Sequence, residues 1–205
     1  VRRFWRPSCA DELVGDAGSR VRPGPGRLCE TAVVRLFVAV TPPDTVLDAV
    51  ARLRRPARPG VRWTTREQWH VTLRFLGEVD DPAPVVAALD RAGLPAAEAR
   101  IGPRVGLLGR GVVMLPVAGL DGLAAAVVAA TAGIGEPVGD RPFRGHLTLA
   151  RVRRGGSARG LLGEELDRTF AVREVALVRS HLGAGPARYE VLHVRGLDPA
   201  PSAGA

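Results

Sequence analysis

Two four-residue segments share the pattern His-x-Thr-Leu, and this repeat constrains the possible fold more than any other feature of the sequence. They are His70-Val71-Thr72-Leu73 and His146-Leu147-Thr148-Leu149. Each lies in a run with the period-two alternation of a β-strand, so its His and Thr are expected on one face and its apolar pair on the other. Two such strands, paired about a pseudo-twofold axis, would bring both His-Thr pairs to the walls of one groove.

Two histidines that face each other can divide general acid–base chemistry between them. An imidazole holds either protonation state near neutral pH, so one can take a proton from water while the other gives one to a leaving oxygen. The Thr hydroxyls can donate hydrogen bonds to phosphate oxygens as negative charge builds up. This arrangement requires no metal and no other cofactor. The other two histidines, His181 and His193, lack a Thr two residues further on and are interpreted as structural.

The charge of the chain agrees with an anionic partner without identifying one. Its 29 basic residues are all arginine, and the formal net charge is +8. Arginine suits bidentate phosphate recognition, and a basic surface favours a polyanion over a cation. A solvated arginine surface explains the charge equally well. Both cysteines, Cys9 and Cys29, lie in the first thirty residues, so we expect no disulfide framework, no Cys-based metal site and a cytoplasmic protein.

The sequence divides into a long body and two tails. Residues 1–32 mix Arg, Gly, Pro and Ser without apolar periodicity and are expected to form a disordered, dispensable tail. A more natural start lies near Val34. The body, residues 33–197, has the length and apolar content of one packed domain, and residues 198–205 are expected to be a loose end. No apolar run reaches the length of a membrane span.

Within the body, strands and helices interleave. Helices are expected to begin at Asp44 and at Pro82 and to cover residues 120–132 and about 157–166. Glycines in the region 106–111 predict a turn. The expected strands cover residues 33–40, 69–76, about 97–105, 111–117, 146–152, about 170–179 and 188–195. Because the strand pairs near 97–117 and 170–195 are hairpin-like, we predict an α+β fold with mainly antiparallel sheets and flanking helices.

The motifs and their flanks resemble those of the 2H phosphoesterase superfamily. Within it, the chain is similar to the RNA 2′,3′-cyclic phosphodiesterases, the LigT-like 2′-5′ RNA ligase family. The matching segments are 35–40 (RLFVAV), 69–77 (WHVTLRFLG), 143–151 (FRGHLTLAR), 177–182 (LVRSHL) and 189–192 (YEVL). The resemblance runs from about Val33 to Leu197 and leaves out only the tails. One departure is Gly145, where the family often has proline; glycine is less restricted, which predicts a looser presentation of His146.

The resemblance implies two pseudo-symmetric lobes around a central catalytic cleft, and hydrolysis of RNA 2′,3′-cyclic phosphate ends to 2′-phosphomonoesters. By analogy His70 is the proton donor, His146 is the proton acceptor, and Thr72 and Thr148 bind the substrate phosphate. Because the two motifs are nearly symmetric, the residues alone do not show which histidine is the acid and which is the base. A monomer that acts on RNA without a membrane or a metal is expected. Three alternatives remain: 2′-5′ ligation of RNA ends, a cyclic phosphodiesterase acting on a small nucleotide, and a non-enzymatic module that binds RNA ends.

Four further residues are candidate substrate contacts. Arg74 stands at an even offset from His70 and is expected on the same face of its strand. Arg151 stands at an odd offset from His146 and would face away unless the strand is bulged; family analogy makes it a phosphate-binding or structural residue. Phe143 and Tyr189 are candidates for stacking on a nucleobase, although core packing is the better interpretation of Phe143.

Overall fold

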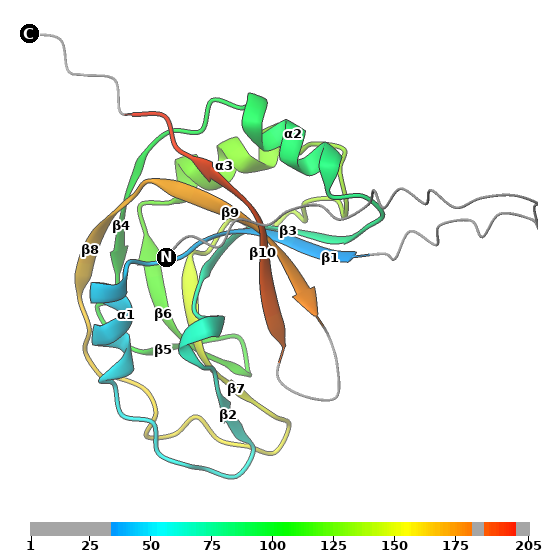
Figure 1. Cartoon of the computed structure of the whole chain (residues 1–205). Helices are drawn as coiled ribbons and strands as arrows, with labels where there is room; N and C mark the ends of the chain where they lie inside the picture. The colour runs from blue at the N-terminus through cyan, green and yellow to red at the C-terminus, as the bar shows by residue number, and fades with distance from the viewer. Residues whose placement is uncertain (1–33, 182–186, 200–205) are drawn as a thin grey trace, which may run out of the picture. The chain divides into compact units, whose positions relative to one another are not determined.

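The computed structural model describes residues 34–181 and 187–199. The expected tail of residues 1–32 and most of the expected C-terminal tail lie outside the described residues. The helices are α1 (Asp44–Ala51), α2 (Ala83–Arg91), α3 (Asp121–Ala130) and the short 3₁₀ helix η1 (Arg66–Gln68). The strands are β1 (Val34–Val40), β2 (Val61–Trp63), β3 (Val71–Val79), β4 (Ala97–Ile101), β5 (Gly106–Leu108), β6 (Val112–Ala118), β7 (His146–Val152), β8 (Arg168–Val172), β9 (Glu174–His181) and β10 (Arg188–Gly196). Figure 1 labels them.

The strands join into one sheet of ten, ordered β10-β9-β1-β3-β7-β6-β4-β8, with β2 paired to β7 and β5 to β6. Each of these strand pairs is antiparallel. The predicted α+β class with a mainly antiparallel sheet is therefore confirmed. Both motif strands, β3 and β7, lie at the centre of the sheet and are neighbours.

The chain repeats one supersecondary unit on either side of this central pair. In the first unit β1 leads through α1 to β3, and in the second β6 leads through α3 to β7; each unit pairs its two strands antiparallel. The units meet where Val71 of β3 pairs with Leu147 of β7. This pairing produces the pseudo-twofold relation expected from the repeated motif.

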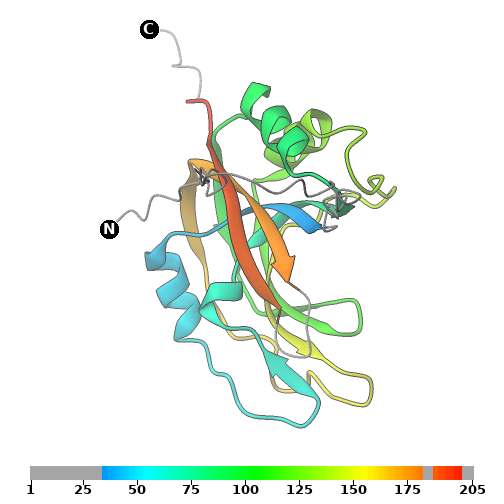
Figure 2. The same cartoon turned by 45° about the vertical axis from the view of Figure 1, so that its right-hand side comes forward.

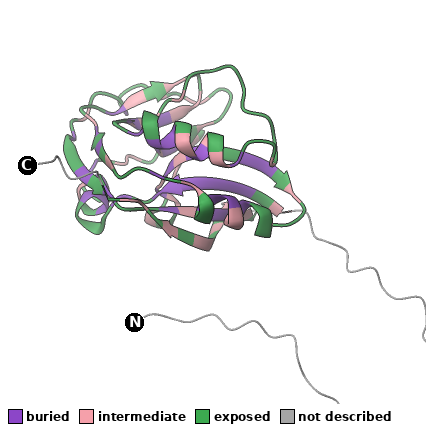
Figure 3. Ribbon diagram, turned by 90° about the horizontal axis from the view of Figure 1, so that it is seen from above, coloured by how far each residue is buried: buried purple, intermediate pink, exposed green. Residues whose placement is uncertain are grey.

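Alternation along the strands separates a packed face from an open one. On β1, Leu36, Val38 and Val40 are buried in the main core, whereas Phe37 and Ala39 pack with Val178 in a small separate cluster. Figure 3 shows the buried residues concentrated along the strands, with exposed residues on the outer sides of the helices. The sheet thus buries one face and leaves the other for side chains with a different task.

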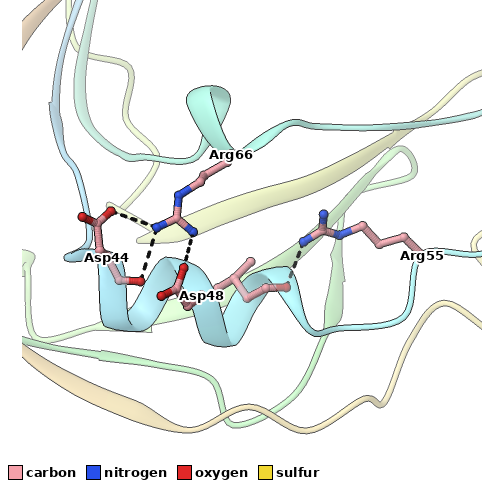
Figure 4. Close-up of polar contacts among 5 residues, drawn as sticks. Asp44, Asp48, Arg55 and Arg66 are labelled. Carbon is pink, nitrogen blue, oxygen red and sulfur yellow. Dashed lines mark hydrogen bonds and ion pairs between the residues drawn. The ribbon is translucent and has the colours of Figure 1, made fainter.

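Helix α1 shows how an arginine outside the core is neutralised. Its apolar stripe, Val46, Leu47 and Val50, is buried. On its outer side Arg66 of η1 donates to the carboxylates of Asp44 and Asp48, each at 2.8 Å (Figure 4).

Several sequence-based expectations were wrong in detail. No helix covers residues 157–166: this stretch is irregular, and Gly160 and Gly163 adopt positive φ, which an α-helix does not use. The single strand expected over 170–179 is two strands, β8 and β9. Near Arg173 the chain stops pairing with β4 and begins to pair with β1. Residues 106–108 of the expected turn form β5.

Two shorter features also differ from expectation. Strand β2 was not predicted, since three residues carry too little periodicity. The ordered chain continues beyond Leu197, because Asp198 forms a bridge with Pro95.

Candidate active site

A groove of about 350 Å³ opens on the face of the sheet that carries both motifs. Its walls come from β1, β2, β3, β7, β9 and β10, together with η1. They comprise Arg35, Phe37, Arg62, Thr64, Gln68, His70, Thr72, Phe75, His146, Thr148, Arg151, Ser180, Ala187 and Tyr189. Three arginines and no carboxylate stand among them, so the groove favours an anion.

The two His-x-Thr motifs meet across the centre of this groove. Because Val71 pairs with Leu147 in an antiparallel register, His70 stands opposite Thr148, and Thr72 opposite His146. All four side chains line the groove, while Val71 and Leu147 are fully buried beneath it. The groove therefore presents two matched pairs of an imidazole and a hydroxyl.

Backbone carbonyls orient both imidazoles in the same way. His146 Nδ1 lies 2.8 Å from the carbonyl oxygen of Arg144, two residues earlier. Since a carbonyl only accepts, Nδ1 carries the proton, which leaves Nε2 free to exchange a proton with a ligand. His70 likewise makes a hydrogen bond to the backbone of Gln68, two residues before it.

Aromatic rings enclose His70 but not its counterpart. The His70 ring stacks on Phe37 at 4.8 Å between centroids and meets Tyr189 edge-on at 5.0 Å. Burial, together with the positive charges of His146 and Arg151, lowers the pKa of His70 to about 4, against the opposing effect of the hydrogen bond to Gln68. His70 is therefore neutral at pH 7.

Both motif strands carry a β-bulge at the same motif position. The pairing of β1 with β3 skips one residue at Leu73, and the pairing of β6 with β7 skips one at Leu149. A bulge reverses which face the following residues occupy. The fifth residue after each histidine, Phe75 in one strand and Arg151 in the other, consequently lines the groove.

The same bulge overturns the expectation for Arg74. Instead of sharing the face of His70, Arg74 is buried on the opposite side of the sheet, with 5 % of its surface exposed. Its guanidinium donates to the carbonyls of Val128 and Ile134 at 2.9 and 3.0 Å and to Thr131 Oγ1 at 2.7 Å. Arg74 thus ties β3 to the C-terminal end of α3, where a cation is favourable, and does not reach the groove.

A chain of hydrogen bonds connects the start of the first motif to the bulge of the second. Trp69 Nε1 donates to Thr64 Oγ1 at 2.9 Å. Thr64 Oγ1 in turn lies 2.7 and 2.8 Å from the carbonyl oxygens of Thr148 and Leu149. Thr64 therefore helps to hold the two motif strands in their relative positions.

Gly145 does not loosen the presentation of His146, contrary to the sequence-based prediction. Its carbonyl accepts a hydrogen bond from the amide of Val117 at 2.8 Å. A Cβ at this position would lie 2.3 Å from the Val117 carbonyl oxygen, so only glycine allows so close a contact between the two backbones. The residue before the catalytic candidate is held by pairing with β6.

Of the two aromatic candidates, one lies in the groove and the other does not. Tyr189 lines the groove beside His70. Phe143 does not; it packs against the core and lines a second cavity of about 720 Å³ between α3 and residues 136–143. His181 and His193, expected to be structural, are absent from the groove lining and lie 2.9 and 2.8 Å from carboxylate oxygens of Glu190 and Asp90.

Across residues 34–181 and 187–199, no three His, Cys, Asp or Glu side chains gather as a metal site would need. No helix in the same part of the chain has the length and apolar character to cross a bilayer.

Comparison with known proteins identifies the family. The family model described as LigT like phosphoesterase matches residues 39–103, which contain the first motif. The structure of TT0787 from Thermus thermophilus is similar to 80 % of this chain and 97 % of its own, at 30 % identity and a TM-score of 0.65. The chain belongs to the LigT-like phosphoesterases.

Two further solved structures agree with this assignment. E. coli LigT complexed with 3′-AMP matches at 27 % identity and a TM-score of 0.64 over 80 % of this chain and 98 % of that one. A structure described as a phosphoesterase matches at 26 % identity and 0.67 with the same coverage. No curated protein sequence matches the chain significantly. As a LigT-like phosphoesterase, the protein has phosphodiesterase- or ligase-type activity.

Sequence reasoning missed half of the residues that line the groove. They are Arg35, Phe37, Arg62, Thr64, Gln68, Phe75 and Ala187. Phe75 follows from the bulge, and the Arg35 guanidinium lies over its ring at 4.7 Å from the centroid. Had a bulge been assumed in both motifs, the position five residues after each histidine would have pointed to Phe75 and Arg151.

Proposed function

We propose that this LigT-like phosphoesterase hydrolyses RNA 2′,3′-cyclic phosphate ends to 2′-phosphomonoesters. The observation that carries the proposal is the pair of antiparallel motifs, in which each imidazole stands opposite a threonine hydroxyl, in a groove whose described lining has no carboxylate. A relative, E. coli LigT, has been crystallised with 3′-AMP, which supports a nucleotide phosphate as ligand here. We also propose that the protein is cytoplasmic and acts as a monomer.

In the proposed reaction the four motif side chains have separate tasks, and the roles of the two histidines are taken from the family resemblance. The acceptor, His146, takes a proton from water as the water oxygen bonds to phosphorus. The donor, His70, gives a proton to the 3′ oxygen as its bond to phosphorus breaks, which leaves a 2′-phosphomonoester and a 3′ hydroxyl. Thr72 and Thr148 donate hydrogen bonds to the non-bridging oxygens as their charge grows.

The proton-donor role requires a change in His70 on binding. Without a bound anion His70 is neutral at pH 7, because its pKa lies at about 4. A phosphate anion beside the ring favours the charged imidazolium and raises the pKa. Binding of the anionic substrate would thereby favour the protonated form of His70, which the donor role requires.

This yields a prediction for the titration of His70. By NMR, its ring should titrate near pH 4 in the free protein, and addition of inorganic phosphate should move the midpoint upward, toward neutral pH. His193, which faces Asp90 outside the groove, serves as an internal control, because phosphate bound in the groove does not contact its ring. A His70 midpoint unchanged by saturating phosphate would reverse the two roles and make His70 the acceptor.

The direct test uses an RNA oligonucleotide ending in a 2′,3′-cyclic phosphate, incubated with the protein in EDTA, with the product ends identified. A 2′-phosphate end is expected. A 3′-phosphate end would contradict the assignment of the leaving oxygen. RNA that is bound but unchanged would favour the module that only binds RNA ends, and a 2′-5′ joined product with an added 5′-hydroxyl RNA would favour ligation.

A further inference from the structure

The basic character of the groove continues beyond its lining at one end of the sheet. Arg62 of β2 and Arg151 of β7 stand directly opposite each other in the strand register, and both are exposed. Like charges in this arrangement repel and destabilise a sheet. Among the described residues no carboxylate forms an ion pair with either one. An anion between them would remove the repulsion.

Three loops meet just beyond this pair. They are the segment before β2, the turn between β5 and β6, and the segment after β7. Arg153 N donates to Gly60 O at 2.8 Å, and Val152 N donates to Gly111 O at 2.8 Å, so all three are joined by backbone hydrogen bonds. In Figures 1 and 2 the cyan loop before β2 and the yellow loop after β7 lie together at the lower end of the sheet.

The loops concentrate exposed arginines without carboxylates. We call this surface the basic end, and it comprises Arg58, Arg110, Arg153, Arg154 and Arg159, all exposed. Residues 49–66, 99–120 and 141–163, which build this region, contain no Asp or Glu at all.

In the described ranges of the chain, ion pairs with carboxylates neutralise some arginines of the protein, but not those of the basic end. Arg66, Arg100 and Arg104 each form an ion pair with a carboxylate. Within the part of the chain that the structure describes, none of the five arginines of the basic end does so.

We infer that the basic end binds the phosphate backbone of the RNA chain whose cyclic end occupies the groove, so that the substrate is an RNA oligonucleotide and not a free cyclic mononucleotide. This inference rests on the proposed function. Arg62 and Arg151 connect the groove to the basic end, which gives a chain leaving the groove a continuous path of positive charge. Such contacts with phosphates position a nucleic acid without reading its sequence.

The test compares substrates of different length. We would measure kcat/KM for a 2′,3′-cyclic mononucleotide and for an eight-nucleotide RNA with the same terminal cyclic nucleotide, at several salt concentrations. The wild type should prefer the longer substrate by about 10-fold or more at low salt. The variant Arg153→Gln/Arg154→Gln/Arg159→Gln should lose most of this preference and change mononucleotide hydrolysis by less than about 2-fold. Its salt dependence should weaken by up to about two units of log–log slope, since each contact with a single strand contributes about 0.7.

A matched control separates location from net charge. The variant Arg91→Gln/Arg100→Gln/Arg168→Gln removes three exposed arginines on α2, β4 and β8 and should keep the preference for the longer RNA. Equal kcat/KM for both substrates in the wild type, or equal losses in both triple variants, would overturn the inference. If neither substrate is hydrolysed, the proposed function fails; fluorescence anisotropy with the eight-nucleotide RNA then tests the basic end by itself, and equal affinity of both variants and the wild type would overturn it.

Discussion

Replacing His146 with alanine is expected to lower kcat on a cyclic-phosphate RNA by about 10²–10⁴-fold, the usual contribution of one positioned general acid or base. His70→Ala should cause a loss of similar size. Both imidazoles line the groove, and neither belongs to the buried core, so the variants should fold as the wild type does. Steady-state kinetics, with circular dichroism to check the fold, measure this.

A variant that lacks both histidines tests whether they act in the same step. Because both histidines serve one displacement at phosphorus, His70→Ala/His146→Ala should lose little more than the worse single variant. His181→Ala and His193→Ala are the controls, since both rings bind carboxylates away from the groove, and they should retain near wild-type kcat. Full turnover by either groove variant would exclude the two-histidine mechanism.

Replacing Arg74 with methionine is expected to lower the free energy of unfolding by about 2–4 kcal/mol, because buried carbonyls at the end of α3 would lose a charged donor. Burial lowers the pKa of Arg74, but a guanidinium stays charged in proteins. The substitution would remove the hydrogen bonds that join β3 to the end of α3, and no backbone amide of α3 would take their place. Denaturant unfolding of wild type and variant gives the difference.

Activity provides the complementary measurement for Arg74. The side chain points away from the groove, so the folded variant should retain kcat within a few-fold of the wild type. Arg153→Met, an exposed arginine on a loop, is the control and should change stability by less than about 0.5 kcal/mol. A variant of Arg74 with unchanged stability and strongly reduced kcat would return this residue to the substrate site.

The repeated motif was sufficient to predict the centre of the fold. Alternation in a strand is a local property, so it places His70 with Thr72 and His146 with Thr148 without knowledge of neighbouring strands. The apolar residues between them had to be buried, and Val71 and Leu147 are. The antiparallel α+β class followed from the strands and turns around them and is confirmed.

Residues beyond each Thr could not be placed from the sequence, because a bulge exists only relative to the partner strand. The extra residues at Leu73 and Leu149 are defined by the pairings with β1 and β6. They reversed the expected face of Arg74 and brought Arg151 into the groove. Alternation counted from the histidine fails at the first such irregularity.

The sequence by itself thus determined which chemical groups the protein possesses and which pairs share a strand face, since both depend on residue type and on local backbone geometry. The tertiary structure alone decided which distant groups meet. Arg35, Phe37 and Tyr189 reach the groove through strand pairing, and the arginines of the basic end come together because three loops pair at one end of the sheet. Contacts between residues far apart in a chain depend on register and on loop closure, and no local pattern encodes them.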